Sequence, residues 1–439
     1  MKFTRCLCFA SIVLALAVGA CVNHVPIERL SCPCLDGYTC CDATNQCLPM
    51  GQVCPADAGA TNDGAIAPVW SDAKPSKWQP LASWFSSNGM ILPAVPFVMG
   101  DQVTFPDDYG SGRAITYRFA QNDWLVHPNG HWPGRGGQVG LVWTGSQVVY
   151  WGGVVQAKCN NLGGLYSLST DTWSAINTTG APLLAVDGGG YTGKEVVLRG
   201  DSCLPHLSGD DLRGPVIGAL YNPTTDTWRN MSTVNAPTTI TGIDVVIGEK
   251  VVCWGGAPYV GAPDYTSPTL GWTNSGAVYD AADDTWTAMS TDNAPSPRAN
   301  ALAFAMRGKM FVWGGTDGAT NSLGEQDYFH NGGIFDPETN TWTSISKDGS
   351  PTLTADNGFW AEERGLVYVW ATIEISGATY SGVALWTYDP SADRWATIDV
   401  SGLPEMLLPS FVWTGQDLLA FGGLTSMSNH SMAVLRYTP

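Results

Sequence analysis

Short apolar stretches alternate with polar, turn-forming stretches along most of this chain, and one aromatic spacing recurs among them. An aromatic residue stands seven positions before a tryptophan in six places: Tyr117/Trp124, Tyr166/Trp173, Tyr221/Trp228, Tyr279/Trp286, Phe335/Trp342 and Tyr388/Trp395. Three of these pairs enclose Asp or Asn followed by Pro, at Asn222-Pro223, Asp336-Pro337 and Asp389-Pro390. Such dipeptides suit the first two positions of a type I turn. Each pair therefore predicts a β-hairpin with one large ring on each strand.

Two further short strands precede each predicted hairpin. Residues 141–145 and 148–153 show the pattern, and the second run ends in an aromatic residue followed by two glycines. The same ending recurs at Trp254-Gly255-Gly256, Trp313-Gly314-Gly315 and Phe421-Gly422-Gly423. A lone hairpin is marginally stable in water, so these units must pack together. Four-stranded units that recur every ~50 residues predict the blades of a β-propeller rather than a sandwich.

The pattern resembles the kelch-repeat family over residues 77–439. The resemblance is carried by Gly-Gly at the end of the second strand, the aromatic residue on the third strand and the tryptophan on the fourth. It implies an all-β, kelch-like propeller, in which we expect the glycine pair to allow close backbone approach. Three blades depart from the pattern, with Pro106-Asp107, Gly200-Asp201 and Ala371-Thr372 where Gly-Gly would stand.

The two ends of the repeat region complete each other. The last unit, from about residue 409 to Tyr437, stops before any tryptophan, whereas Trp78 lies on a strand without a preceding hairpin partner. We therefore predict a seven-bladed propeller in which the N-terminal strand closes the last blade. This arrangement removes the need for capping repeats.

The N-terminal residues predict export. Residues 1–20 have a basic start, an apolar run and small residues before Cys21, which is a secretory leader too short to span a membrane as a helix. Residues 18–21 resemble the bacterial lipobox, and this resemblance implies cleavage before Cys21 and its acylation, which would anchor the protein at a membrane. Asn23 favours the outer membrane. We expect a lipid-anchored protein of the bacterial cell envelope, at the outer membrane or cell surface; an unmodified secreted chain is the alternative.

A small cysteine-rich module follows a tether of residues 21–31. Residues 32–54 are too few to bury a core, so in an exported chain they predict three disulfides, with a zinc site as the rival interpretation. The module would serve as a recognition element or as a protease-resistant spacer. Residues 55–76 are rich in Ala, Gly, Asp and Pro, which predicts an exposed linker to the propeller at 77–439. The six cysteines are Cys32, Cys34, Cys40, Cys41, Cys47 and Cys54.

The charge balance narrows the possible partners. The chain has 439 residues, with 21 Lys and Arg against 39 Asp and Glu, and its formal net charge is -18. Such an acidic chain is poorly suited to bind nucleic acid or an anionic membrane surface by charge. We therefore expect membrane attachment through the lipid anchor alone.

The predicted binding surface lies on the loops that follow the second strands. In kelch propellers these loops and the linkers between blades emerge on one face and usually form the binding surface. Here the long loops at 257–274 and 316–331 carry aromatic rings beside carboxylates, which suits stacking on sugars or gripping a polypeptide. Alternatively, the rings pack under their own loops and the acids are merely solvated. We expect a monomer that binds a protein or glycan of the envelope. The candidate residues are Tyr259, Asp264, Tyr265, Trp272, Asp327 and Tyr328.

An enzyme at the same face, acting on carbohydrate or as an oxidase, is the alternative function. Some copper radical oxidases share seven kelch-like blades, but their ligand set of histidines, tyrosines and a modified cysteine matches no motif here. His127 and His131 have a helical ligand spacing, yet Pro128 and Gly130 oppose a helix, so we interpret both as surface histidines. No nucleophile elbow or phosphate-binding glycine loop is present. We therefore predict no catalytic residue, metal ligand or cofactor.

Three cysteines fall within the repeats. Cys159 and Cys203 occupy equivalent loops of the second and third blades, where an oxidising compartment would allow a disulfide between them. Cys253 lies within an apolar strand, which predicts a buried free thiol.

Overall fold

The chain divides into two compact units, Met1–Pro75 and Ser76–Pro439. In the first unit, β1 (Tyr38–Cys41) and β2 (Gln46–Pro49) pair as antiparallel strands. The side chains of the cysteine-rich module, the leader and Cys21 lie outside the described part, so their roles stay predictions. The computed structural model describes residues 38–41, 46–49, 78–85, 96–106, 114–127, 139–155, 158–159, 161–167, 169–203, 213–240, 242–258, 271–319, 327–352, 355, 357–373, 382–401, 403, 409–421, 424–426 and 429–437.

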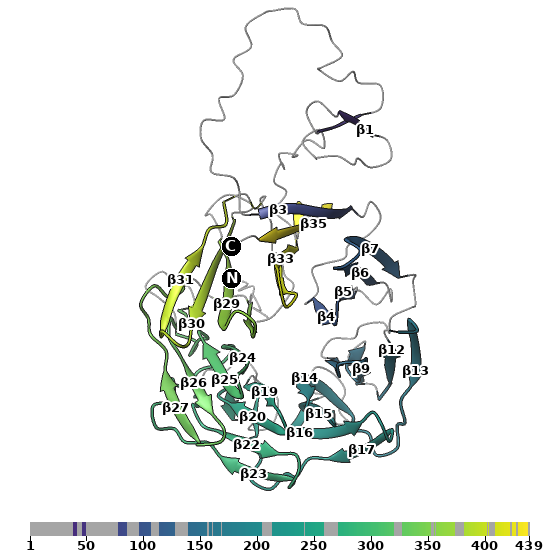
Figure 1. Ribbon diagram of the computed structural model, residues 1–439. Coiled ribbons are helices and arrows are strands. Elements are labelled where there is room, and N and C mark those ends of the chain that lie inside the picture. The colour runs from purple at the N-terminus through teal and green to yellow at the C-terminus, as the bar shows by residue number, and fades with distance from the viewer. Residues whose placement is uncertain are drawn as a thin grey trace, which may run out of the picture. The chain divides into compact units, whose positions relative to one another are not determined.

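The second unit is an all-β propeller of seven blades, as the sequence predicts (Figure 1). Each blade is an antiparallel sheet with a path of four strands. First strands such as β8, β14 and β19 lie against one another around the centre, and the fourth strands form the outside of the ring. Blade by blade the strands are β4 (Phe97–Met99), β5 (Gln102–Pro106), β6 (Ala114–Arg118), β7 (Asp123–His127); β8 (Gly140–Trp143), β9 (Gln147–Trp151), β12 (Gly163–Ser167), β13 (Thr172–Ala175); β14 (Leu184–Tyr191), β15 (Val196–Cys203), β16 (Arg213–Asn222), β17 (Thr227–Asn230); β19 (Ile243–Ile247), β20 (Lys250–Trp254), β22 (Gly276–Asp280), β23 (Thr285–Ala288); β24 (Leu302–Met306), β25 (Lys309–Trp313), β26 (Gly332–Asp336), β27 (Thr341–Ser344); β28 (Asn357–Ala361), β29 (Leu366–Ile373), β30 (Gly382–Asp389), β31 (Arg394–Ile398); and β32 (Ser410–Trp413), β33 (Leu418–Phe421), β35 (Asn429–Tyr437), β3 (Trp78–Phe85).

Three short strand pairs extend the loops. In blade 2, β10 (Val154–Val155) pairs with β11 (Lys158–Cys159), and before blade 4, β18 (Thr239–Ile240) pairs with β21 (Ala257–Pro258). In blade 7, β34 (Leu424–Ser426) pairs with β35. Among the described residues, no helix is long and apolar enough to cross a membrane.

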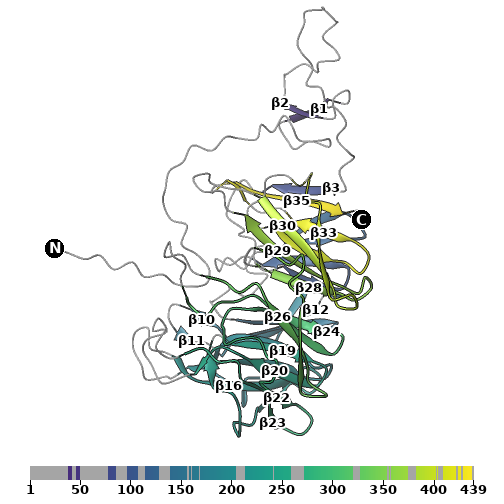
Figure 2. The ribbon, with the colours of Figure 1, turned by 90° about the vertical axis from the view of Figure 1, so that its left-hand side faces the viewer.

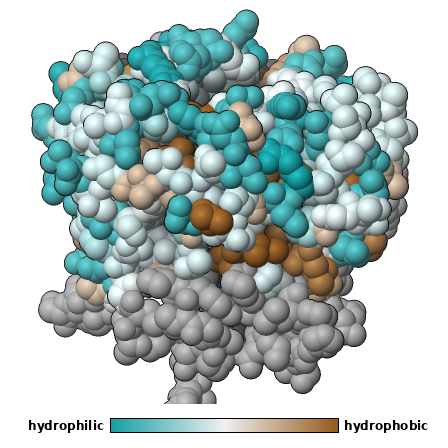
Figure 3. Space-filling model, turned by 90° about the horizontal axis from the view of Figure 1, so that it is seen from below, coloured by the Kyte–Doolittle hydropathy of each residue, from teal (hydrophilic) through white to brown (hydrophobic). Residues whose placement is uncertain are grey.

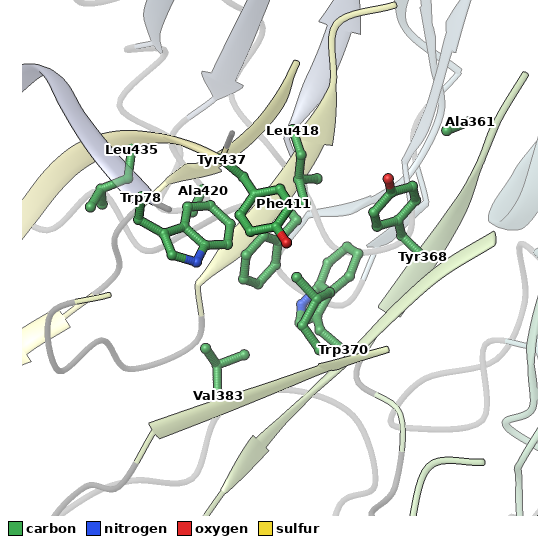
Figure 4. Packing of buried hydrophobic residues seen from close by; sticks show 11 residues of the cluster. Trp78, Ala361, Tyr368, Trp370, Val383, Phe411, Leu418, Ala420, Leu435 and Tyr437 are labelled. Atoms are coloured by element: carbon green, nitrogen blue, oxygen red, sulfur yellow. The ribbon is translucent and has the colours of Figure 1, made fainter. Parts of the chain in front are cut away.

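The prediction that the first strand closes the last blade is confirmed. β3 pairs with β35, and Trp78 lies directly opposite Tyr437 with ring centroids 5.0 Å apart. Trp78 is only 3% exposed, and its Nε1 donates to the backbone oxygen of Asp399 at 3.0 Å. Figure 4 shows the two rings side by side above Phe411. The closing pair repeats the aromatic–tryptophan pairing of the other six blades.

Each predicted hairpin places its aromatic residue directly opposite its tryptophan. Tyr279 and Trp286 are cross-strand partners with ring centroids 5.1 Å apart, and the other five pairs have the same register. The turn ends in an Asp or Asn with left-handed φ, as at Asp284, where φ is 53°. The hydroxyl of Tyr279 donates to this carboxylate at 2.6 Å. Burial of such a ring raises the pKa of the Tyr279 hydroxyl, which therefore stays a donor at neutral pH.

Two hydrogen bonds, which we call the interblade clasp, join each of four blades to the one before it. The backbone N–H of Ser232 donates to Oδ1 of Asp284 at 2.8 Å, and Nε1 of Trp286 donates to the Ser232 oxygen at 2.7 Å. The turn residue and the tryptophan thus bind one linker residue from both sides. The equivalent sets are Asn177 with Asp226 and Trp228, Ser290 with Asn340 and Trp342, and Ser346 with Asp393 and Trp395.

The outermost strands present polar residues to solvent. In β23 and β27 only the tryptophan is buried, and the neighbouring Thr, Ser and Ala residues are exposed. Figure 3 shows the rim on the side of these blades as largely hydrophilic, with apolar residues confined to small patches. The apolar faces of neighbouring sheets pack against one another instead, as where Trp254 and Val252 of blade 4 meet Met310 and Val312 of blade 5.

The glycine pairs end the second strands in a left-handed backbone conformation, which the expectation of close backbone approach does not by itself predict. In the three described pairs both glycines have left-handed φ, between 71° and 95°. Close approach is also confirmed, because a Cβ on Gly315 would lie 2.6 Å from the Ala299 oxygen. Where the pair is missing in blades 3 and 6, the second strand runs on, so that β15 and β29 have eight residues against five in β20 and β25.

We expect Gly315→Ala to destabilise the propeller by about 1–3 kcal/mol more than Gly193→Ala, because overpacking adds to the shared cost of left-handed φ. Gly193 has a φ of 94°, but a Cβ added there would meet no atom within 4 Å, so its replacement isolates the backbone cost. Urea unfolding of both variants measures the difference. Equal losses would show that the linker at Ala299 yields to the extra methyl group.

Candidate functional site

The described candidate residues lie on the loops of two adjacent blades. Trp272 belongs to the loop between β20 and β22 of blade 4, and Asp327 and Tyr328 belong to the loop between β25 and β26 of blade 5. Tyr259, Asp264 and Tyr265 fall outside the described residues. We use the name loop face for the loops that follow the second strands together with the linkers between blades. Figure 2 shows β10 and β11, which belong to such a loop of blade 2, at one side of the propeller strands.

Trp272 links the two loops directly. Its Nε1 donates to the backbone oxygen of Asp317 in blade 5 at 2.5 Å, and Gly318 lies close to the same edge of the indole ring. The ring is half-buried. One edge of Trp272 thus packs against the loop of the neighbouring blade rather than under its own loop, and part of the ring stays accessible.

The described ends of the blade 5 loop are held together by backbone contacts. The hydroxyl of Thr316 donates to the Asp327 oxygen at 2.8 Å, and the Asp327 N–H donates to the Ala319 oxygen at 2.8 Å. The Phe329 N–H donates to the Gly315 oxygen at 2.8 Å. Beside these bonds Asp327 is exposed and Tyr328 is half-buried. Both predicted residues thus sit on a fixed section of backbone.

Arg298, in the linker between blades 4 and 5, contacts the ends of the blade 5 loop from their buried side. Its side chain is 1% exposed, and its guanidinium lies 4.2 Å from the centre of the Phe329 ring. All of its donors point to uncharged oxygens of the linker and of the blade 5 loop. The acceptors are the backbone oxygens of Ser296 (2.8 Å), Gly314 (2.7 Å) and Asn331 (3.1 Å), Oγ of Ser296 (2.9 Å) and Oδ1 of Asn331 (2.7 Å).

The backbone of Arg298 binds the other loop. Its oxygen accepts from the N–H of Gly256 at 2.9 Å, and its N–H donates to the Thr273 oxygen at 3.4 Å. Burial lowers the pKa of Arg298 to about 10, with the Asp317 carboxylate opposing this shift, so the side chain is charged at neutral pH. Arg298 therefore joins the loops of blades 4 and 5 through one residue. Sequence reasoning missed it, because a single arginine in a proline-rich linker gives no periodic signal.

The chemistry available at this surface is recognition by rings and carboxylates. Half-buried Trp272, Tyr328 and Phe329 lie beside the exposed side chains of Asp327 and His330. Within the described ranges, no group of three or more His, Cys, Asp or Glu side chains is placed to hold a metal ion. Aromatic rings with one accessible face and a polar neighbour suit contact with a protein or a sugar.

The cysteines of the propeller differ in state. Cys159 is disulfide-bonded, and Cys203 ends β15 in the next blade, so their pairing stays a prediction. Cys253 is a buried free thiol, as predicted, and burial raises its pKa well above the ordinary value.

The interpretation of His127 as a surface histidine is wrong. Its side chain is 3% exposed, because it occupies the inner side of β7 at the junction with blade 2. His330 is exposed on the blade 5 loop. His131 and His206 lie outside the described residues, and only the backbone of His430 is described.

Two comparisons with known proteins agree with this fold. The sequence model of the KLHDC2/KLHL20/DRC7 Kelch-repeats domain matches residues 207–429, about half of the chain. A putative F-box/kelch-repeat protein from Arabidopsis thaliana is 29% identical over 108 residues, which cover 25% of this chain and 25% of that protein. The chain thus spans about a quarter of the length of this curated relative.

Proposed function

Because the chain belongs to the kelch-repeat family, whose propellers are typically protein-binding scaffolds, we propose that this propeller binds a protein partner at the loop face of blades 4 and 5. The observation that carries the proposal is the coupling of these two loops through Arg298 and Trp272. It holds aromatic side chains from two blades in one fixed arrangement. A fixed arrangement reduces the entropy lost on binding.

The composition of this surface fits a protein contact. Binding energy at protein interfaces is concentrated in a few aromatic or arginine side chains that are buried on association. Tyr328 offers such an anchor, and the exposed Asp327 beside it would select against acidic partners. A glycan is the second candidate, because the half-buried Trp272 ring would also support stacking with a sugar.

The proposed setting is the bacterial cell envelope. Support comes from the disulfide at Cys159, since such bonds persist mainly in oxidising compartments outside the cytosol. The leader and the lipobox-like residues ending in Cys21 point the same way. We propose lipid attachment at Cys21, with the propeller carried at the outer membrane or cell surface. The Cys159–Cys203 bond would then brace the loops of blades 2 and 3.

Affinity capture with the full chain, disulfides intact, tests the binding site. We expect Tyr328→Ala to weaken retention of one envelope component about tenfold or more, which corresponds to the loss of one anchor residue. Thr343→Ala is the matched control, because Thr343 is exposed on β27 of the same blade, away from the loop. Protein and glycan fractions are tested separately. Equal retention by parent and Tyr328→Ala would exclude this part of the loop face as the binding site.

A further inference from the structure

One position in the repeat carries a histidine in blade 1 and an apolar residue in every other blade. It is the third residue after the hairpin tryptophan, and the side chain points towards the neighbouring blade. In the other blades it is Ile176, Met231, Met289, Ile345, Ile398 and, in β3, Leu81. His127 takes this place in blade 1 and is as buried as Ile176, Met231, Met289 and Ile345. A histidine at a position that packing alone would fill calls for a polar partner.

His127 has oxygen atoms beside both ring nitrogens. Nε2 lies 2.8 Å from Oγ1 of Thr116, which lies 2.7 Å from Oγ1 of Thr104 in the same blade. Nδ1 lies 3.5 Å from Oδ1 of Asp171, in the hairpin turn of blade 2. The same Asp171 oxygen accepts from the Tyr166 hydroxyl at 2.6 Å. His127 is therefore in contact with a carboxylate across the junction between the two blades.

This contact stands where the interblade clasp has its backbone donor. In the four clasps described above, the residue after the apolar position donates its N–H to the turn Asp or Asn of the next blade at 2.8–2.9 Å. In blade 1 that residue is Pro128, which has no N–H to donate. The His127 ring faces the carboxylate of Asp171 instead. The His127 ring, which can gain or lose a proton, thus stands where the four clasps use a backbone N–H.

The protonation state of the ring decides the strength of the contact. At 3.5 Å a neutral imidazole makes only a weak hydrogen bond, whereas an imidazolium makes an ion pair with Asp171. Both ring nitrogens would then donate, and Thr116 and Asp171 supply an acceptor for each. Burial opposes the charge, and the adjacent carboxylate favours it. At the far end of the same hairpin, Arg118 and Asp123 neutralise each other in a bidentate pair.

We propose that the junction of blades 1 and 2 is a pH-responsive contact, in which protonation of His127 adds an ion pair to Asp171 between the blades. The partner raises the affinity of the folded state for the proton. The stability that this ion pair adds is therefore present at the pH values at which His127 is protonated in the folded protein. It is lost as the pH rises through the titration of His127 in the folded protein. Acidification tightens this junction and leaves the four clasped junctions unchanged.

NMR titration of the histidine rings in the full chain tests the charge coupling. The variant Asp171→Asn removes the carboxylate but keeps an oxygen for Tyr166, and asparagine already stands at the equivalent turns as Asn122 and Asn340. Because Asp171 is 49% exposed, we expect the parent His127 to titrate only about 0.5–1 pH unit higher than in the variant. An equal or lower titration point in the parent would overturn the proposal.

Hydrogen exchange tests the mechanical consequence. After correction for intrinsic rates, we expect the amides of β7 and of the Asp171 turn to be better protected at pH 5.5 than at pH 7.5 in the parent. In His127→Ile, which restores the residue type of Ile176, Ile345 and Ile398, this difference in protection should vanish. The same variant also identifies the His127 signal in the NMR titration, because that signal is missing from its spectrum. The same pH dependence in parent and variant would show that the contact does not respond to pH.

Discussion

Replacement of Arg298 by alanine is expected to lower the free energy of unfolding by about 3–4 kcal/mol, because it strands several buried acceptors at once. The buried oxygen of Gly314 and Oδ1 of Asn331 lose their donor, and the space beneath Phe329 is emptied. Urea unfolding monitored by tryptophan fluorescence measures the loss. Exchange of the amides in residues 314–316 and 327–331 should rise with it.

Two further variants separate the possible causes. Arg298→Lys keeps the charge but replaces a planar fork by a single ammonium group, so we expect it to recover less than half of the loss. Arg307→Ala is the control for removal of an arginine, because Arg307 is exposed and stacks over the Trp360 ring at 4.8 Å. It should cost less than about 1 kcal/mol. If Arg298→Ala lowered the free energy of unfolding as little as Arg307→Ala, the two loops would hold their arrangement without the Arg298 side chain.

Replacement of Trp78 by alanine is expected to cost about 3–5 kcal/mol, the usual range for a fully buried tryptophan. Trp78 packs on Tyr437 and Phe411 at centroid distances of 5.0 and 6.0 Å, and its indole N–H bonds to Asp399. These contacts hold the first strand in the last blade (Figure 4). The loss therefore falls on the closure of the ring, and exchange in β35 and β33 should rise before that in blades 3–5.

Gln79→Ala is the matched control for the closing strand. Gln79 follows Trp78 on β3, pairs through its backbone with Arg436 and is exposed. Its replacement should change the unfolding free energy by less than about 0.5 kcal/mol. A Trp78→Ala chain as stable as this control would mean that backbone pairing alone closes the propeller.

The repeat architecture could be predicted from sequence because its determinants are local. A ring at Tyr279, a short turn and a ring at Trp286 fix one hairpin, and repetition of the spacing gives the blades. The glycine pairs marked the ends of second strands, but their left-handed conformation became clear only from the backbone. β29 continues where Ala371-Thr372 replace the glycine pair, since neither residue favours that conformation. β15 also continues, although its first residue at this place is Gly200, so one glycine alone does not end the strand.

The candidate site was less predictable because its contacts join distant parts of the chain. Arg298 binds oxygens up to 33 residues away, and no pattern around the linker encodes that distance. His127 was assigned to the surface from its neighbours Pro128 and Gly130. Alignment of the repeats on their tryptophans would have placed it beside Ile176 and Met231, and hence in the core. The residues next to His127 indicate a loop, whereas its position within the repeat indicates that its side chain is buried.

Ring closure by the first strand also has a consequence for the order of events in folding. Synthesis delivers Trp78 first, yet its indole partner Asp399 is 321 residues away and its cross-strand partner Tyr437 comes at the end. Such a long-range contact forms late, so an unfinished chain carries an unpaired strand and an open blade at the same time. Two chains in this state can satisfy both by exchanging first strands. Strand exchange between molecules therefore competes with closure of the ring. The share of exchanged molecules is expected to rise with the protein concentration during refolding.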